Sequence, residues 1–87
     1  MFEKELGIIG VGKIGSALLK RIICTNTIEK NNIIIYDIDE TRLKERTIEF
    51  DVHSAKNNAD LVRSSKFILI AVIPQVINKV LQEIGSI

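Results

Sequence analysis

Three glycines near the amino terminus have the spacing of a phosphate-binding turn. Gly10, Gly12 and Gly15 form the pattern G-x-G-x-x-G. In that pattern the first glycine permits a tight bend, the second lets the main chain approach a diphosphate, and the third lets a helix pack closely on a sheet. The free N–H groups at the start of the helix, together with its dipole, attract anions. The spacing therefore predicts a site for the diphosphate of a nucleotide.

The chain around the glycines strengthens this prediction, because a glycine triplet alone also marks ordinary turns. An apolar run at 6–9 precedes the triplet, and an apolar pattern with helical spacing follows it. A second apolar run, Ile33–Tyr36, ends at Asp37. In dinucleotide-binding chains an acidic side chain about 20 residues after the glycines binds the ribose hydroxyls. Asp37 is close to that separation. Strand, turn, helix, strand and acid in this order predict dinucleotide binding.

The other reactive side chains do not suggest a second site. His53 is the only histidine and has no further metal-ligating residue at suitable spacing, so we expect an exposed strand-end residue and no metal site. Cys24, the only cysteine, cannot form an internal disulfide and ends an apolar helical face, where we expect buried packing. We expect no catalytic residue in this chain.

Composition limits the class of protein. The 87 residues suffice for one small domain, 1–87, and 46% hydrophobic residues indicate a globular rather than a disordered chain. A net charge of +1, with basic residues scattered among acids, argues against nucleic-acid binding. No stretch reaches the roughly 18 apolar residues of a membrane span, and residues 1–5 are too charged and too short for a signal peptide. We therefore expect a cytoplasmic protein.

The elements that must position the glycine turn alternate between strand and helix patterns. We expect strands at 5–10, 33–37, 48–53 and 67–72. We expect helices at about 13–24, from 39 onward, at about 56–63 and from 76 onward. Successive β-branched residues at Ile33–Ile35 are typical of a parallel strand that is covered on both faces. The pattern predicts an α/β fold: a Rossmann-like parallel sheet of order 3-2-1-4 with flanking helices, an incomplete doubly wound fold.

In that order, the first and fourth strands meet at the switch point of the sheet. The glycine turn and the loop Ala71-Val72-Ile73-Pro74 converge there, so we expect the adenine half of a dinucleotide toward Asp37 and the nicotinamide toward Pro74. We expect the charged run at 44–46 to be a solvated helix face. Arg42 can reach the ribose end of the cofactor, as an arginine does in a site that accepts a 2′-phosphate.

The chain resembles the N-terminal nucleotide-binding domain of pyrroline-5-carboxylate reductase over nearly all of its length. The first motif is Ile9-Gly10-Val11-Gly12-Lys13-Ile14-Gly15-Ser16-Ala17-Leu18, against I-G-x-G-x-M-G-x-A-[LI] in the family. The second, more discriminating motif is Ala71-Val72-Ile73-Pro74-Gln75, against A-V-K-P-Q. The resemblance implies an oxidoreductase of proline biosynthesis that transfers a hydride from NAD(P)H to a cyclic imine.

The resemblance also implies which residues contact the cofactor. Along the pyrophosphate it places Gly10, Val11, Gly12, Lys13 and Ile14, with Ile9 opening the motif. Near the adenosine it places Asp37 and Asn58. Near the nicotinamide it places Ala71, Val72, Ile73 and Pro74.

Two positions depart from the family pattern. Ile73 replaces the usual lysine, which removes a positive charge near the nicotinamide. Asp37 stands where members that prefer the phosphorylated cofactor often carry a small polar residue. Because a carboxylate binds free ribose hydroxyls and repels a 2′-phosphate, Asp37 favours NAD over NADP, and Arg42 is the argument for NADP.

The family's helical C-terminal domain, which supplies the dimer contacts and most of the substrate site, is absent from 1–87. We therefore expect the cofactor-binding part of a reductase-like enzyme, without turnover on its own. The alternatives are a stand-alone NAD-binding sensor or regulatory module, and a small α/β protein with an empty glycine turn. The predicted edge strand Phe67–Val72 is apolar and uncharged, which predicts pairing with a continuation of the protein or with a second copy in a homo-oligomer.

Overall fold

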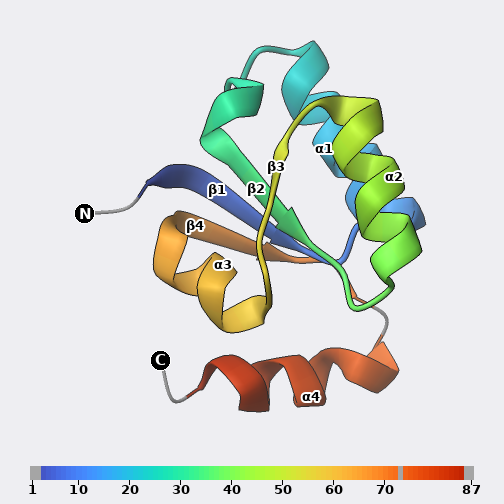
Figure 1. Cartoon of the computed structure of the whole chain (residues 1–87), viewed down its shortest axis with the longest axis vertical. Coiled ribbons are helices and arrows are strands. Elements are labelled where there is room, and N and C mark those ends of the chain that lie inside the picture. Colours follow the sequence, from blue (N-terminus) through green and yellow to red (C-terminus); the bar gives the residue numbers. More distant parts are fainter. Residues whose placement is uncertain (1–2, 73, 86–87) are drawn as a thin grey trace.

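A parallel sheet carries the glycine turn at its centre. The computed structural model describes residues 3–72 and 74–85. The strands in this part of the chain are β1 (Lys4–Ile9), β2 (Ile33–Tyr36), β3 (His53–Ser54) and β4 (Ser65–Ile70). The helices are α1 (Lys13–Cys24), α2 (Glu40–Phe50), α3 (Asn58–Ser64) and α4 (Pro74–Ile84), with a 3-10 turn η1 (Lys30–Asn32) before β2. The order β3-β2-β1-β4, all parallel, confirms the predicted fold class (Figure 1).

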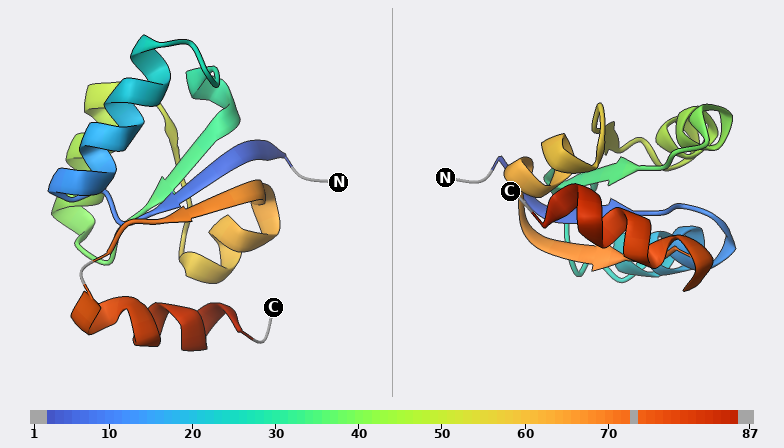
Figure 2. Two further views of the ribbon diagram at one scale, coloured as in Figure 1. Left: turned by 180° about the vertical axis from the view of Figure 1, so that it is seen from behind. Right: turned by 90° about the horizontal axis from the view of Figure 1, so that it is seen from below.

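Helices cover both faces of the sheet. Ile33 and Ile35 of β2 belong to the hydrophobic cluster beneath α1 and α2, whereas Ile34 belongs to the cluster beneath α3 and α4. All three side chains are buried, as the run of β-branched residues predicts. Figure 2 shows α4 running back from the end of β4 toward α3, so the last helix lies on the same face as α3.

The predicted third strand at 48–53 is largely wrong. Helix α2 continues through Phe50, and β3 contains only His53 and Ser54. Leu43 and Phe50 pack against the core at helical spacing, so the short alternation that suggested a strand is part of a helix. Asp51 ends α2 in the left-handed conformation, at φ 55°, and its hydrogen bond and ion pair with Lys30 hold the pKa of its carboxyl below the usual value.

The apolar residues at the start of α1 do not all face the core. The helix buries Gly15 and Leu19, while Ile14 is 70% exposed and Leu18 is 39% exposed. The cause is the close contact between Gly15 and the glycine turn, where a Cβ would fall on the Gly10 carbonyl. Cys24 is exposed rather than buried, which corrects the expectation of a packed side chain.

Strand β4 lies at one edge of the described sheet, as predicted. Its residues Phe67 and Ile68 are 56% and 38% exposed. This edge is apolar and partly exposed. Its pairing with a continuation of the protein or with a second copy stays a prediction. His53 is exposed, as expected from the sequence, but it is the first residue of β3 and not the last.

Gly7 in β1 is required for the packing of α3 on the sheet. A Cβ at this position would lie 2.5 Å from a methyl carbon of Leu61 and closer still to the Ser65 hydroxyl. Leu61 is fully buried and Ser65 nearly so, so neither side chain has room to move away.

We expect Gly7→Ala to lower the free energy of unfolding by about 1–3 kcal/mol, the usual cost of overpacking a core. Urea unfolding followed by circular dichroism measures this change. The matched control is Gly12→Ala, where a Cβ meets nothing nearer than Arg42 at 3.7 Å. Because alanine is a weaker N-cap residue than glycine but meets no atoms here, the control is expected to unfold closer to the wild-type midpoint than Gly7→Ala does. A midpoint for Gly7→Ala equal to that of the control or the wild type would contradict the packing argument.

Candidate dinucleotide-binding site

The glycine turn is fixed against the ends of three strands. The Gly10 N–H donates to the Tyr36 carbonyl over 2.8 Å, and the Ala71 N–H donates to the Ile9 carbonyl over 2.8 Å. Gly10 has φ +94°, a conformation that L side chains rarely adopt. A Cβ there would also lie 2.6 Å from the Ala71 carbonyl oxygen. The fold itself therefore requires glycine at this position.

Gly12 differs from Gly10 because the fold does not require its missing side chain. Its φ of −71° lies outside the left-handed region that favours glycine, and a Cβ would meet only the Arg42 guanidinium at ordinary contact distance. Gly12 is the N-cap of α1, and that helix has neither a side-chain cap hydrogen bond nor an acidic residue in its first turn. The main chain at Gly12 is thus open on the side where the first N–H groups of the helix face outward.

The peptide groups of Val11 are held by side chains from three elements. The Val11 N–H donates to Asp37 Oδ2 over 2.9 Å. The Val11 carbonyl accepts hydrogen bonds from Ser16 Oγ at 2.6 Å and from Arg46 Nε at 3.1 Å. Arg46 Nε also lies 2.6 Å from Ser16 Oγ, so Arg46 is a structural contact of the turn rather than the solvated residue expected from the sequence.

Asp37 is buried at the end of β2, with 6% exposure. Besides the Val11 N–H, its carboxylate accepts the Asp39 N–H through Oδ1 over 2.9 Å. Arg42 Nη1 lies 3.5 Å from Asp37 Oδ2 and is the same atom that stands nearest to Gly12. The structure therefore brings the glycine turn, Asp37 and Arg42 together.

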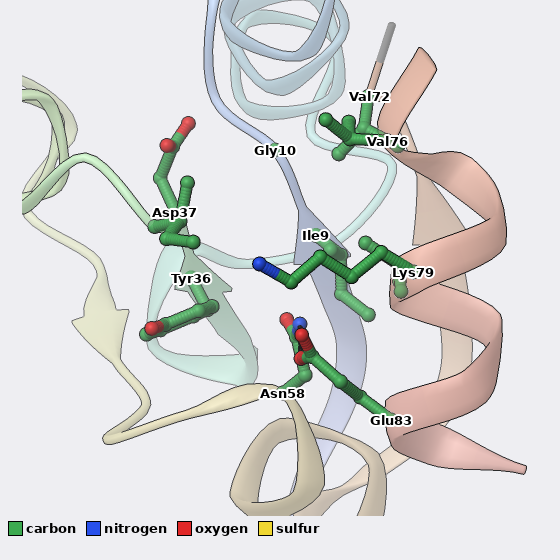
Figure 3. Close-up of a pocket in the computed structure, with 11 residues that line it drawn as sticks. Ile9, Gly10, Tyr36, Asp37, Asn58, Val72, Val76, Lys79 and Glu83 are labelled. Carbon is green, nitrogen blue, oxygen red and sulfur yellow. Dashed lines mark hydrogen bonds between the residues drawn. The ribbon is translucent and has the colours of Figure 1, made fainter. Parts of the chain in front are cut away.

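A hollow of about 90 Å³ lies beside the turn, between the ends of β1 and β2 and helix α4 (Figure 3). Five residues predicted to contact a cofactor line it: Ile9, Gly10, Asp37, Asn58 and Val72. Its volume is well below the roughly 300 Å³ of a small ligand pocket. Only one part of a dinucleotide would therefore fit into the hollow, and the rest would lie along the glycine turn.

The remaining predicted residues lie around the hollow rather than in it. The Val11 side chain is fully buried behind the turn, while Lys13 and Ile14 are exposed on the first turn of α1. Ala71 packs beneath Gly10. Pro74 is the first residue of α4, a position that suits proline, and Ile73 lies outside the described residues.

Three polar side chains that line the hollow are not among the residues predicted from the sequence: Tyr36, Lys79 and Glu83. Lys79 and Glu83 are one turn apart on α4, so they share a side of the helix. The sequence feature that marks Lys79 and Glu83 is their helical spacing beside the apolar residues Val76 and Val80, which line the same hollow. Glu83 accepts a hydrogen bond of 2.7 Å from Asn58 Nδ2, which ties α4 to α3.

The part of the chain that the structure describes contains neither a metal-binding cluster nor a membrane-spanning helix. Within residues 3–72 and 74–85, no group of three side chains has the composition and proximity of a metal site. No helix in the same ranges is long and apolar enough to cross a membrane. The glycine turn and the adjoining hollow therefore remain the candidate site.

Curated proteins with similar sequences are pyrroline-5-carboxylate reductases. The enzyme of Methanosarcina acetivorans is 33% identical over 86 residues, which is 99% of this chain and 32% of that protein. The enzyme of Escherichia coli is 29% identical over 84 residues, covering 97% of this chain and 31% of that protein. The chain thus spans about a third of the length of the curated relatives that it matches.

Solved structures agree. A pyrroline-5-carboxylate reductase from Coxiella burnetii superposes on 97% of this chain and 31% of that chain with a TM-score of 0.84, at 20% identity, which supports the fold. The Plasmodium falciparum pyrroline carboxylate reductase, solved with NADP bound, superposes on 99% of this chain and 30% of that chain with a TM-score of 0.76 at 29% identity.

The resemblance to the N-terminal domain of these reductases is thereby confirmed. Residues 5–87 also match the family described as "NADP oxidoreductase coenzyme F420-dependent". This match covers almost the whole chain, including the glycine turn, Asp37 and the residues of the hollow. The chain belongs to this family.

Proposed function

We propose that residues 1–87 form the NAD(P)-binding part of a pyrroline-5-carboxylate reductase-like oxidoreductase. The observation that carries this proposal is the open space at Gly12. Gly7, Gly10 and Gly15 are each required because a Cβ would collide with the protein itself, whereas a Cβ at Gly12 would have room. A glycine that the fold does not require suits the close approach of a ligand to the main chain.

The surroundings of Gly12 fit a diphosphate. Helix α1 begins there without a capping side chain or a first-turn acid, so its N–H groups and the positive end of its dipole are free for an anion. Arg42 adds a positive charge beside the same turn. We therefore assign the pyrophosphate to the segment 10–14, following the implied contacts of Gly10, Val11, Gly12, Lys13 and Ile14.

The two ends of the dinucleotide follow from the topology of the sheet. The adenosine lies toward the end of β2 and Asn58, and the nicotinamide lies toward 71–74, because ligands of open parallel sheets bind across the carboxyl ends of the strands. Bound there, the nicotinamide supplies the hydride chemistry. The chain's own residues bind and orient the cofactor, and none of them is assigned to the imine.

The preference between NAD and NADP depends on two opposing side chains. Asp37 favours the free ribose hydroxyls of NAD, and its carboxylate repels a 2′-phosphate. Arg42 lies 3.5 Å from the same carboxylate and reduces that repulsion. We propose that Asp37 sets a preference for NAD and that Arg42 supports whatever affinity for NADP remains.

A stand-alone NAD-binding sensor or regulatory module is the second candidate. Hydride transfer requires the second reactant to be held within about 3.5 Å of the nicotinamide, and the relatives extend well beyond the third that this chain matches. Both candidates share the cofactor site and differ only in turnover.

The first prediction for the proposed function concerns Gly12. We expect Gly12→Val to abolish binding of NADH and NADPH in titration calorimetry, because the branched side chain fills the space that the diphosphate needs. The variant is expected to stay folded, since a Cβ at Gly12 meets no atom closer than 3.7 Å. Wild-type affinity in a folded Gly12→Val protein would remove the diphosphate from this turn.

The second prediction concerns cofactor preference. We expect Asp37→Ser to shift the ratio of the NADH and NADPH dissociation constants by about tenfold toward NADPH, since one charge repulsion is removed. Arg42→Ala is expected to move the ratio the opposite way, and Arg63→Ala is the matched control. Asp37 also accepts a hydrogen bond from Val11. Any loss of affinity from removing that contact affects both cofactors and cancels in the ratio. A ratio unchanged in both variants would remove these side chains from the ribose end.

The third prediction separates the two candidate functions. We expect residues 1–87 to bind NADH without oxidising it when pyrroline-5-carboxylate is added, because no side chain here is assigned to the imine. Absorbance of the reduced nicotinamide measures the rate. Turnover dependent on the imine would show that this chain is an enzyme by itself.

A further inference from the structure

One hydrogen bond joins the two helices of the α3/α4 face inside the wall of the hollow. Asn58 Nδ2 donates to Glu83 Oε2 over 2.7 Å, linking the first residue of α3 to the last turn of α4. Asn58 is only 6% exposed, and both side chains line the hollow (Figure 3). The bond is therefore part of the candidate site.

This hydrogen bond fixes the orientation of the Asn58 amide. An ionised carboxylate only accepts hydrogen bonds, so Glu83 selects the amide nitrogen of Asn58 and leaves the oxygen on the other side. Asn58 Oδ1 is buried and has no hydrogen-bond partner among the described residues. Buried acceptors in folded proteins are nearly always paired. A donor from a ligand in the hollow would complete the set of hydrogen bonds.

Glu83 forms its hydrogen bond with Asn58, although Lys79 is a possible ion-pair partner nearby in the sequence. Lys79 precedes Glu83 by one helical turn, at the spacing of common ion pairs on helices. Within residues 3–72 and 74–85 the structure records no ion pair between them. Figure 3 shows the Lys79 side chain extending across the hollow toward the ends of β1 and β2. The carboxylate of Glu83 is thus directed to the asparagine.

We propose that Glu83 is a positioning residue for the dinucleotide. It holds the Asn58 amide so that Oδ1 accepts a hydrogen bond from the adenosine half of the cofactor, whose donors are the ribose hydroxyls and the adenine amino group. Glu83 acts through Asn58 and needs no contact with the ligand. The inference rests on the proposed dinucleotide-binding function and adds to it a residue on α4 that governs affinity.

Glu83→Gln separates orientation from helix packing. A glutamine side chain both donates and accepts, so it pairs with Asn58 in either amide orientation and keeps α3 and α4 joined. We expect the urea midpoint to stay at the wild-type value, while the dissociation constants of NADH and ADP-ribose rise about three- to tenfold, the effect of one hydrogen bond. ADP-ribose lacks the nicotinamide, so an equal rise for both ligands assigns the effect to the adenosine half.

A double-mutant cycle tests whether Glu83 acts through Asn58. Asn58→Ala is expected to weaken binding by at least as much as Glu83→Gln, and adding Glu83→Gln to it is expected to cause no further loss. The matched control is Gln82→Ala, an exposed neighbour on α4, with affinity expected to equal that of the wild type.

Two outcomes overturn the inference while leaving the proposed function intact. One is wild-type affinity in Glu83→Gln, and the other is an equal loss from Glu83→Gln with and without Asn58. Failure of the proposed function gives a different result, because the wild-type protein then binds neither NADH nor NADPH.

Discussion

The peptide groups of Val11 are the constraint on which the rest of the site depends. Asp37 from the end of β2 accepts the N–H, while Ser16 from α1 and Arg46 from α2 donate to the carbonyl. The main chain of Val11 thus connects three elements around the glycine turn. Because these bonds are made within the protein itself, they fix the directions of the N–H groups that follow the turn. Binding then costs less ordering of the loop than it would for a mobile turn.

The rotation of α1 follows from the same turn. Gly15 packs on the Gly10 carbonyl, and this contact turns Leu19 into the core. The same rotation leaves Ile14 exposed at the start of the helix, although helical spacing alone assigns it to the buried face. An apolar side chain exposed beside a proposed cofactor site is a local conflict of the kind that functional sites produce.

Local patterns predict this fold better than they predict its contacts. Successive β-branched residues and the glycine spacing each report a backbone conformation, so the sheet and its order followed from the sequence. The alternation at 48–53 fits a strand or the end of a helix, and packing of Phe50 on the core decided for the helix. Arg46 and Val11 are 35 residues apart, and Asn58 and Glu83 are 25 apart. No local pattern of charge identifies partners that lie so far apart in the sequence.

The described contacts are unevenly divided between the two ends of the proposed cofactor. On the adenosine side, Asp37 and Asn58 are both buried, and Glu83 orients the second of them. On the nicotinamide side, the described residues Ala71 and Val72 are only half-buried. In the proposed function, these two buried side chains, Asp37 and Asn58, therefore bind the half of the cofactor that does no chemistry. Such a division lets one chain fix the cofactor while the site for the imine is built by other residues.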